Sequence, residues 1–412
     1  MRYKKPIFSI LIFIVILISS IIPITRVYAT TPPSNYIIPQ YVKYSVEMNV
    51  TVTDLSGTND YYFMLPRLDN REPNSLMWRD TPPYQESVLL YHDIANSNPN
   101  PFLSHDRFNN TFDYFNSTNL SGTVSLSQHY NITLNEIIFS NISDLEIGEY
   151  DWNEDIFDLY CNNTEEYYDI NDLDLIYASN VLSGILPADN EVEKAEKIGN
   201  FVVDHLTYDD TLVDEMGASW AYDNSRGDCS EYSSLMITLL RIQNIPARKV
   251  TGFVLSNNPS FKPSVGQEFT FSIDPTGGEK DFLGHAWVEY YVENIGWIPA
   301  DPTWHDSSYS YINRIDYLRF NFNVGANWTI PFLSPPNDNF SEFPVPCIGV
   351  PLLALPDVEY KMKITILETN LKPNMSFILI ISIVVIIGVI ILVVLVVGSA
   401  AKKPKNRNKY NY

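Results

Sequence analysis

Alternating polar and apolar residues dominate the N-terminal part of the chain. Residues 41–53 (YVKYSVEMNVTVT) alternate along their length and are rich in β-branched and aromatic types, which is typical of a half-buried strand. Further strand-like runs follow, separated by clusters of Asn, Pro and Ser, at residues 61–65, 87–91, 122–129 and 136–139. Their regular spacing predicts a β-rich, sandwich-like domain over residues 36–145.

Helical spacing replaces this alternation after residue 145. An acidic stretch leads into a helix predicted over residues 171–182. A clearer helix is predicted over residues 190–206, where apolar residues share one face and Asn190 with Glu193 forms a capping box at the start.

A third helix is predicted from Cys229 to about Asn244. Its apolar positions follow helical spacing, so that one face can pack against a core: Tyr232, Leu235, Met236, Leu239, Leu240 and Ile242. Asp228 is a favourable N-cap residue, and Glu231 completes an Asp-x-x-Glu capping box. Asn244 suits the left-handed conformation that commonly ends a helix.

Strand-like runs return in the C-terminal part. Residues 285–292 and 297–300 flank a turn and predict a hairpin, which brings Asp301 near His285. The other predicted strands are residues 248–255, 317–323 and 360–367. A long Ser-, Pro- and Gly-rich insert, residues 256–284, precedes the hairpin and contains a short hairpin predicted at 268–273; a loop of this length is more often functional than filler.

Two long apolar runs lie at the ends of the chain. Basic residues 2–5 precede an apolar run that ends at Ile22, and Ala29 offers a small residue for signal-peptidase cleavage. Residues 1–29 are therefore predicted to be a signal peptide, with an uncleaved N-terminal anchor as the alternative. Residues 375–397 carry no charge and are long enough to span a hydrocarbon core of about 30 Å, which predicts a transmembrane helix.

These runs predict where the rest of the chain lies. The tail, residues 398–412, is basic and is therefore expected inside the cell, so that the single-pass protein sits in the cell membrane with its main part outside the cytoplasm. Asn-x-Ser/Thr sequons, which mark acceptors for glycosylation, agree with this location: Asn49, Asn109, Asn116, Asn119, Asn131, Asn141, Asn162, Asn327, Asn339 and Asn374.

Composition narrows the classes of partner. The chain has 49 acidic and 27 basic residues and a formal net charge of −22. A surface of this sign repels nucleic acid, so no nucleic-acid partner is expected. The acidic segments lack the ligand spacing of an EF-hand, and the histidines lack the spacing of a zinc site, so the sequence indicates neither a metal nor a cofactor.

The cysteines are Cys161, Cys229 and Cys347. Outside the cytoplasm an odd number implies a free thiol or a bridge between molecules. One arrangement pairs Cys161 with Cys347 and leaves Cys229 free.

Cys229 is the candidate nucleophile. It lies in the first helical turn, among backbone N–H groups at the positive end of the helix dipole, where a thiolate is favoured and the pKa is expected to fall. Thiol acylation also needs a base and an acceptor that orients the base, and His285 with Asp301 can supply these roles. The alternatives are a buried structural cysteine and an aspartate that only makes a turn before proline.

Several linked motifs carry a family resemblance. They are Gly227-Asp228-Cys229-Ser230-Glu231-Tyr232, Leu240-Arg241-x-x-x-Ile245-Pro246-Ala247-Arg248-x-Val250-x-Gly252, His285-Ala286-Trp287-Val288-Glu289 and Trp297-x-Pro299-x-Asp301-Pro302-Thr303. In order and spacing they resemble the transglutaminase-like superfamily over about residues 185–325. The departures are Asn244, where glycine is usual, and the long insert.

The resemblance implies an α+β fold with a papain-like core. The expected organisation is the β-rich domain 36–145, a catalytic domain 150–330, a Pro-rich and strand-like membrane-proximal segment 331–372, and the transmembrane helix. The resemblance further implies that Cys229 attacks an amide carbonyl, His285 is the base and Asp301 orients it. The backbone N–H of Cys229 would hold the oxyanion, with a second donor upstream for which Trp220 is a candidate.

Two functions from different classes follow. The first is a membrane-anchored cysteine enzyme that acts on protein or peptide amides through a thioester, by hydrolysis or by acyl transfer to an amine. The alternative is a non-catalytic surface-binding or adhesion module that keeps the fold as a scaffold. The long insert would roof the cleft and influence the choice of substrate.

Overall fold

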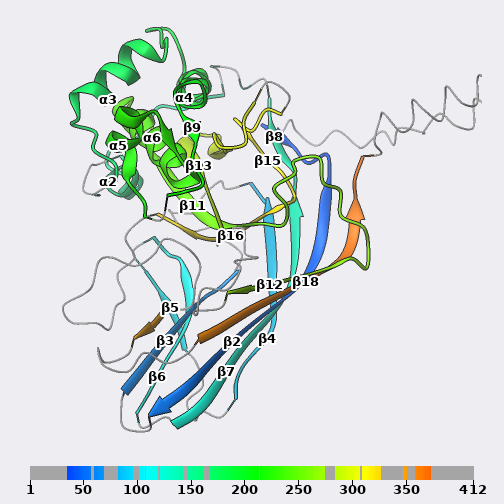
Figure 1. Cartoon of the computed structure of the whole chain (residues 1–412). Coiled ribbons are helices and arrows are strands. Elements are labelled where there is room, and N and C mark those ends of the chain that lie inside the picture. Colours follow the sequence, from blue (N-terminus) through cyan, green and yellow to red (C-terminus); the bar gives the residue numbers. More distant parts are fainter. Residues whose placement is uncertain are drawn as a thin grey trace, which may run out of the picture.

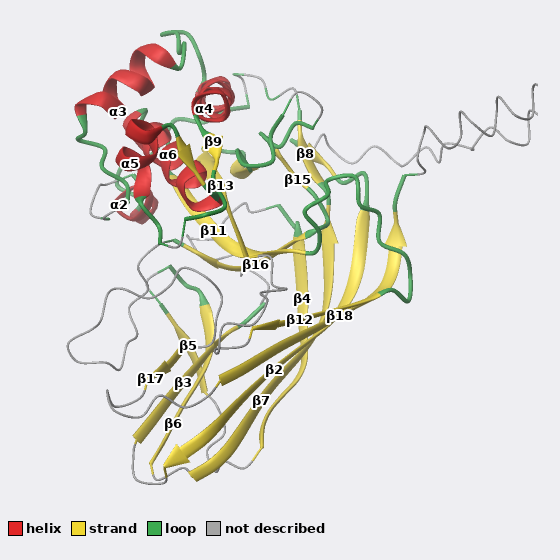
Figure 2. Ribbon diagram, in the orientation of Figure 1, coloured by secondary structure: helices red, strands yellow, loops and turns green. Residues whose placement is uncertain are grey.

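The structure is a computed structural model. It describes residues 35–56, 60–68, 82–95, 102–106, 108–118, 121–140, 142, 144, 146–161, 165, 167–212, 214–273, 284–306, 309–325, 347–349 and 358–372. Helices gather at one end of the molecule and long strands at the other (Figures 1 and 2). The chain therefore forms an α/β lobe and a β lobe.

A five-stranded antiparallel sheet forms the larger part of the β lobe. Its strand order is β12 (Glu268–Ile273), β18 (Val358–Asn370), β2 (Tyr41–Ser56), β7 (Ser121–Asn135) and β4 (Gln85–Ala95). Alternate residues of β2, from Val42 to Val52, are buried, as their alternation predicts. A second sheet has the order β17 (Cys347–Gly349), β3 (Asp60–Pro66), β6 (Thr111–Thr118) and β5 (Phe102–His105).

Two C-terminal segments complete the β lobe. The strand predicted over residues 360–367 is confirmed as β18, which lies between β12 and β2. The hairpin predicted at residues 268–273 is wrong, because this stretch is the single strand β12, paired with β18 along its length. This part of the insert is thus held at the edge of the sheet, where its backbone groups find a partner.

A four-stranded antiparallel sheet and six helical segments form the α/β lobe. The strand order is β14 (Gly296–Ala300), β13 (Gly284–Val292), β11 (Ala247–Val254) and β16 (Arg319–Val324). The helical segments are α2 (Asp155–Tyr160), α3 (Leu173–Tyr177), the π-helical η1 (Ala178–Leu182), α4 (Glu191–His205), α5 (Gly217–Asn224) and α6 (Cys229–Ile242). Helix α6 packs against β13 and β11, and its residues from Cys229 to Arg241 are all buried.

Short strands join the remaining segments. Strand β8 (Ile137–Phe139) pairs with both β1 (Tyr36–Ile37) and β15 (Arg314–Ile315), and β9 (Thr207–Tyr208) pairs in parallel with β10 (Arg226–Gly227). The helix predicted over residues 190–206 is confirmed as α4, including its capping box. The left-handed conformation predicted for Asn244 is also confirmed, with φ of 59°.

The two lobes share a core along strand β16. The hydroxyl of Tyr44 donates to the carbonyl of Tyr317 at 2.6 Å, and its ring lies 4.9 Å from that of Phe320. The side chain of Gln85 bonds both the N–H and the carbonyl of Asn321, at 2.8 and 2.9 Å. At Gly252 of β11 a Cβ atom would lie only 1.8 Å from the carbonyl oxygen of Phe320, so glycine permits this close strand pairing.

The thiol of Cys161 is free and buried, so the predicted pairing with Cys347 does not form. Burial raises the pKa of Cys161 to about 12, which keeps the thiol neutral and unreactive. In the described part of the chain, no helix is long and apolar enough to cross a membrane. The predicted signal peptide 1–29 and transmembrane helix 375–397 lie outside the described residues.

Candidate active site

Helix α6 presents Cys229 at its first turn. The Asp228 side chain accepts the N–H of Ser230 at 2.7 Å, and Glu231 accepts the N–H of Asp228 at 3.0 Å, so the predicted capping box is confirmed. The other carboxylate oxygen of Glu231 accepts the N–H of Met216 at 2.8 Å. This cap therefore holds both the nucleophile and the segment that leads into α5.

The β13–β14 hairpin brings His285 and Asp301 together. His285 is the second residue of β13, and Asp301 directly follows β14, whose last residue Ala300 pairs with Val288. The Nε2 atom of His285 lies 2.7 Å from Oδ2 of Asp301, and both side chains are buried. The contact that the turn in the sequence predicts is thus formed.

The sulfur of Cys229 lies against the same strand. It accepts a hydrogen bond from the backbone N–H of Ala286, the residue after His285. Because Nε2 of His285 faces Asp301, Nδ1 is the ring nitrogen left to exchange a proton with the thiol. Helix α6, β13 and the end of β14 therefore bring the three predicted residues to one place.

A buried arginine, which the sequence analysis missed, completes the charge balance. The Nε atom of Arg319 in β16 donates to Oδ2 of Asp301 at 2.8 Å, and its Nη1 atom lies 2.7 Å from Asp316. Burial alone would raise the pKa of Asp301, but the neighbouring His285 and Arg319 outweigh it and hold that pKa below the ordinary value. Asp301 is consequently ionised and orients the imidazole of His285 through their 2.7 Å contact.

The resting thiol differs from the sequence expectation. Burial raises the pKa of Cys229 to about 12, and the Asp228 and Asp301 carboxylates act in the same direction. The N–H of Ala286 and the ammonium of Lys249 oppose them without prevailing. The expected fall in pKa at the helix terminus is wrong, because loss of hydration on burial, with the two carboxylates, outweighs the groups that favour the thiolate. The thiol is neutral until a base accepts its proton.

Other side chains around the site also escaped sequence analysis. Lys249 is fully buried in β11 and forms an ion pair with Glu215. The Lys249 ammonium supplies positive charge near the sulfur of Cys229. The Trp304 ring lies 6.1 Å from that of His285 and packs on the guanidinium of Arg319. The ring of Trp220, the candidate second donor, packs on the guanidinium of Arg226. A buried cation within an apolar strand is the signal that could have revealed Arg319 and Lys249.

The described residues contain no group of three or more His, Cys, Asp or Glu side chains that could hold a metal ion.

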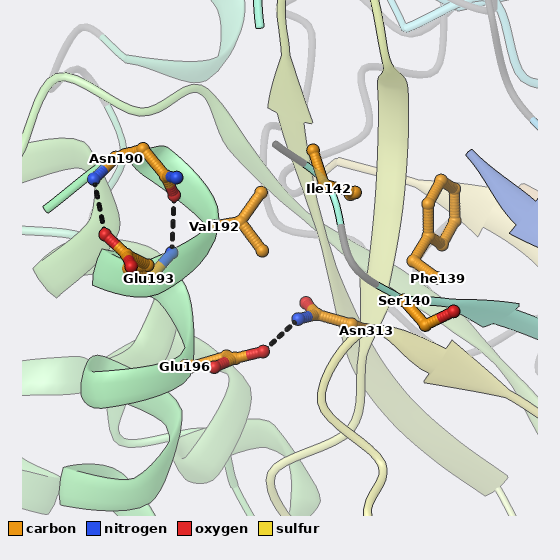
Figure 3. Close-up of a pocket in the computed structure, with 8 residues that line it drawn as sticks. All are labelled: Phe139, Ser140, Ile142, Asn190, Val192, Glu193, Glu196 and Asn313. Carbon is orange, nitrogen blue, oxygen red and sulfur yellow. Dashed lines mark hydrogen bonds between the residues drawn. The ribbon is translucent and has the colours of Figure 1, made fainter. Parts of the chain in front are cut away.

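A separate cavity lies beside the first turns of helix α4. It has a volume of about 190 Å³ and is lined by residues from β8, α4 and the segment before β15 (Figure 3). Glu196 on its wall accepts the side-chain N–H of Asn313 at 2.8 Å. The cavity contains none of Cys229, His285 and Asp301, so it is not the site of the reacting groups.

Comparison with known proteins places this geometry in a family context. The sequence profile described as the transglutaminase-like superfamily matches residues 180–302, which contain all three residues. The protein-glutamine gamma-glutamyltransferase of Pseudomonas aeruginosa is 34% identical over 86 residues, or 20% of this chain and 11% of that protein. The uncharacterised protein YebA of Bacillus subtilis is 28% identical over 95 residues, 23% of this chain and 11% of that protein.

The match thus spans about a tenth of each of these curated relatives. Among solved structures, a candidate cysteine protease from Cytophaga hutchinsonii superposes with a TM-score of 0.51, covering 82% of this chain and 95% of its own, at 16% identity. At this sequence identity the superposition shows a shared fold. Because it covers 82% of this chain, the shared fold includes residues outside the α/β lobe.

We predict that Arg319→Met destabilises the protein by about 3–5 kcal/mol, because it leaves the buried Asp301 and Asp316 without their cation. Urea unfolding measures the change. The control is Arg226→Met, which removes the half-exposed ion pair with Asp209 and should cost less than about 1 kcal/mol. Equal stability of the two variants would contradict the proposed charge balance.

A second prediction concerns Glu231. Burial raises the pKa of Glu231 to about 7. The N–H of Met216 opposes this rise, and the Asp228 carboxylate adds to it. In the unfolded chain the pKa of this carboxyl is near 4.5. Between these two pKa values Glu231 is protonated in the folded state and ionised in the unfolded state. Protonation of Glu231 therefore stabilises the folded protein. This stabilisation is complete below pH 4.5 and is lost as the pH rises through about 7. The loss should amount to about 3 kcal/mol.

Urea unfolding of the wild type and of Glu231→Gln at several pH values tests this contribution. The variant should lack the fall in stability between about pH 5 and about pH 8. Glu193→Gln is the matched control, since Glu193 holds the same capping position at the exposed start of α4 and should leave the fall in place. Parallel curves for the wild type and Glu231→Gln would refute the assignment.

Proposed function

Because residues 180–302 form a domain of the transglutaminase-like superfamily, we propose that the chain is a cysteine enzyme that transfers acyl groups from peptide or glutamine amides through a thioester. The observation that carries this proposal is the 2.7 Å contact between His285 and Asp301, with the Cys229 thiol bonded to the next N–H along the strand. This arrangement leaves one imidazole nitrogen for the thiol proton.

The first half of the reaction forms the thioester. The sulfur of Cys229 attacks the amide carbon while its proton passes to Nδ1 of His285, and the carbonyl oxygen becomes an oxyanion. Because the thiol is neutral at rest, proton transfer accompanies attack, and the ionised Asp301 stabilises the imidazolium. The carbon–nitrogen bond then breaks, and the imidazolium returns the proton to the leaving ammonia or amine.

The second half releases the acyl group. Water or a primary amine attacks the thioester carbon, and His285 accepts a proton from the attacking group. The carbon–sulfur bond then breaks, and His285 returns that proton to the sulfur to restore the thiol. Hydrolysis and amine transfer therefore use the same machinery and differ only in the acceptor.

The alternative is a non-catalytic binding module that keeps the fold as a scaffold. A scaffold has no need of a buried His285–Asp301–Arg319 arrangement, because isolating such charges from water costs free energy that an apolar replacement would avoid. The charge arrangement thus favours the enzyme.

An assay with the full chain, purified in detergent, tests the proposal. A glutamine-containing peptide is incubated with and without a primary amine; ammonia release, peptide cleavage and amine incorporation each identify a different reaction. Cys229→Ala should abolish the activity and His285→Ala should reduce it by at least about 10²-fold. Cys161→Ala, which removes the other free buried thiol, should retain it. Activity that survives in Cys229→Ala would refute the mechanism.

We also propose that the protein is anchored in the cell membrane by residues 375–397, with the two lobes outside the cytoplasm. The ends of the described chain support this: Asn370 pairs with Tyr41, and the N–H of Lys372 donates to Gln40 at 2.7 Å. Residues 40–41 and 370–372 therefore lie side by side. Protease added to intact cells should digest the lobes, and complete protection of them would contradict this topology.

A further inference from the structure

The proposed reaction requires two hydrogen-bond donors at the developing oxyanion. One is a backbone N–H at the start of α6 that the capping side chain does not use. Asp228 accepts the N–H groups of Ser230 and Glu231. The N–H of Cys229 has no acceptor among the described residues, so it is one donor. A second donor must reach the same point from another element.

Tyr208 lies on β9, which pairs with the short strand that leads into α6. Strands β9 and β10 pair in parallel with Tyr208 opposite Gly227, and the N–H of Asp209 donates to the carbonyl of Gly227 at 2.9 Å. The Tyr208 ring also lies 6.3 Å from that of Tyr232, whose hydroxyl is tied to the carbonyl of Leu206 at 2.8 Å. The backbone of Tyr208 is therefore held beside the segment that leads into the nucleophile.

The groups around the phenol keep its hydroxyl protonated. The groups that act on it electrostatically are Cys229 first, then Asp228, Asp210 and Asp301. Burial raises the pKa of Tyr208, and the Asp228, Asp210 and Asp301 carboxylates act in the same direction, so the hydroxyl keeps its proton. The side chain is 53% exposed, and its hydroxyl has no hydrogen-bond partner among the described residues. The hydroxyl is thus a protonated donor with room for a ligand.

We propose that the Tyr208 hydroxyl is the second oxyanion donor, acting with the backbone N–H of Cys229. This inference rests on the proposed thioester chemistry. The hydroxyl donates its hydrogen bond as negative charge develops on the carbonyl oxygen and keeps its proton throughout. It therefore stabilises the transition states of acylation and deacylation and takes no part in generating the thiolate.

Two reactions of the same sulfur test this role. With 4-nitrophenyl acetate, the sulfur forms a bond to the acetyl carbon, the thiol proton passes to His285, and the bond to nitrophenolate breaks through an oxyanion. With iodoacetamide, the sulfur displaces iodide and no oxyanion forms. Loss of an oxyanion donor slows only the first reaction.

The experiment measures both rates at Cys229 in the full chain, purified in detergent. In Tyr208→Phe the acetylation rate should fall on the order of 10²-fold, while alkylation should change by less than about twofold. Tyr177→Phe is the matched control, because Tyr177 is also 53% exposed and lies on α3; both of its rates should equal those of the wild type.

Each other outcome overturns the inference. Equal losses in acetylation and alkylation would assign Tyr208 to positioning or activation of the thiol. Unchanged acetylation would exclude the hydroxyl from the oxyanion site. A wild type that acetylates no faster than Cys229→Ala would contradict the proposed function itself, which separates that failure from the failure of the inference.

Discussion

Asp301 is a buried carboxylate held between two cationic partners, and the active-site arrangement depends on it. Isolated from water, an ionised carboxylate is stable only with opposite charge and hydrogen bonds around it. Arg319 supplies a permanent positive charge, and His285 supplies one when the thiol proton arrives. Asp301 therefore holds the imidazole in one orientation, with Nδ1 left for the proton of the buried thiol.

This constraint connects the two lobes. Arg319 begins β16, and the residues around it pack into the core shared with the β lobe through Tyr44, Phe253 and Phe320. Paired hydrogen bonds from Gln85 hold the backbone of β16 at Asn321. The β lobe therefore supports the strand that presents the arginine, which gives this lobe a structural role in the active site in addition to any role in binding a partner.

Local patterns predicted the parts of the site that lie close together in sequence. The capping box at Cys229 depends on residues three apart, and the hairpin that brings Asp301 to His285 depends on one turn, so both were predictable. Arg319 was missed because its contact depends on the pairing of β11 with β16. Tyr208 was missed because β9 has only two residues and no periodicity. The pKa of Cys229 was predicted with the wrong sign, because burial is a property of the assembled core.

Mass spectrometry after an acid quench tests the central claim, that Cys229 carries the acyl group, most directly. The full chain is mixed with a glutamine-containing peptide and quenched while turnover continues. The account predicts that the proteolytic fragment containing Cys229 gains the mass of the donor peptide less ammonia, and that the fragment containing Cys161 is unmodified. Product formation with unmodified Cys229 at every quench time, together with an adduct on another residue, would contradict it.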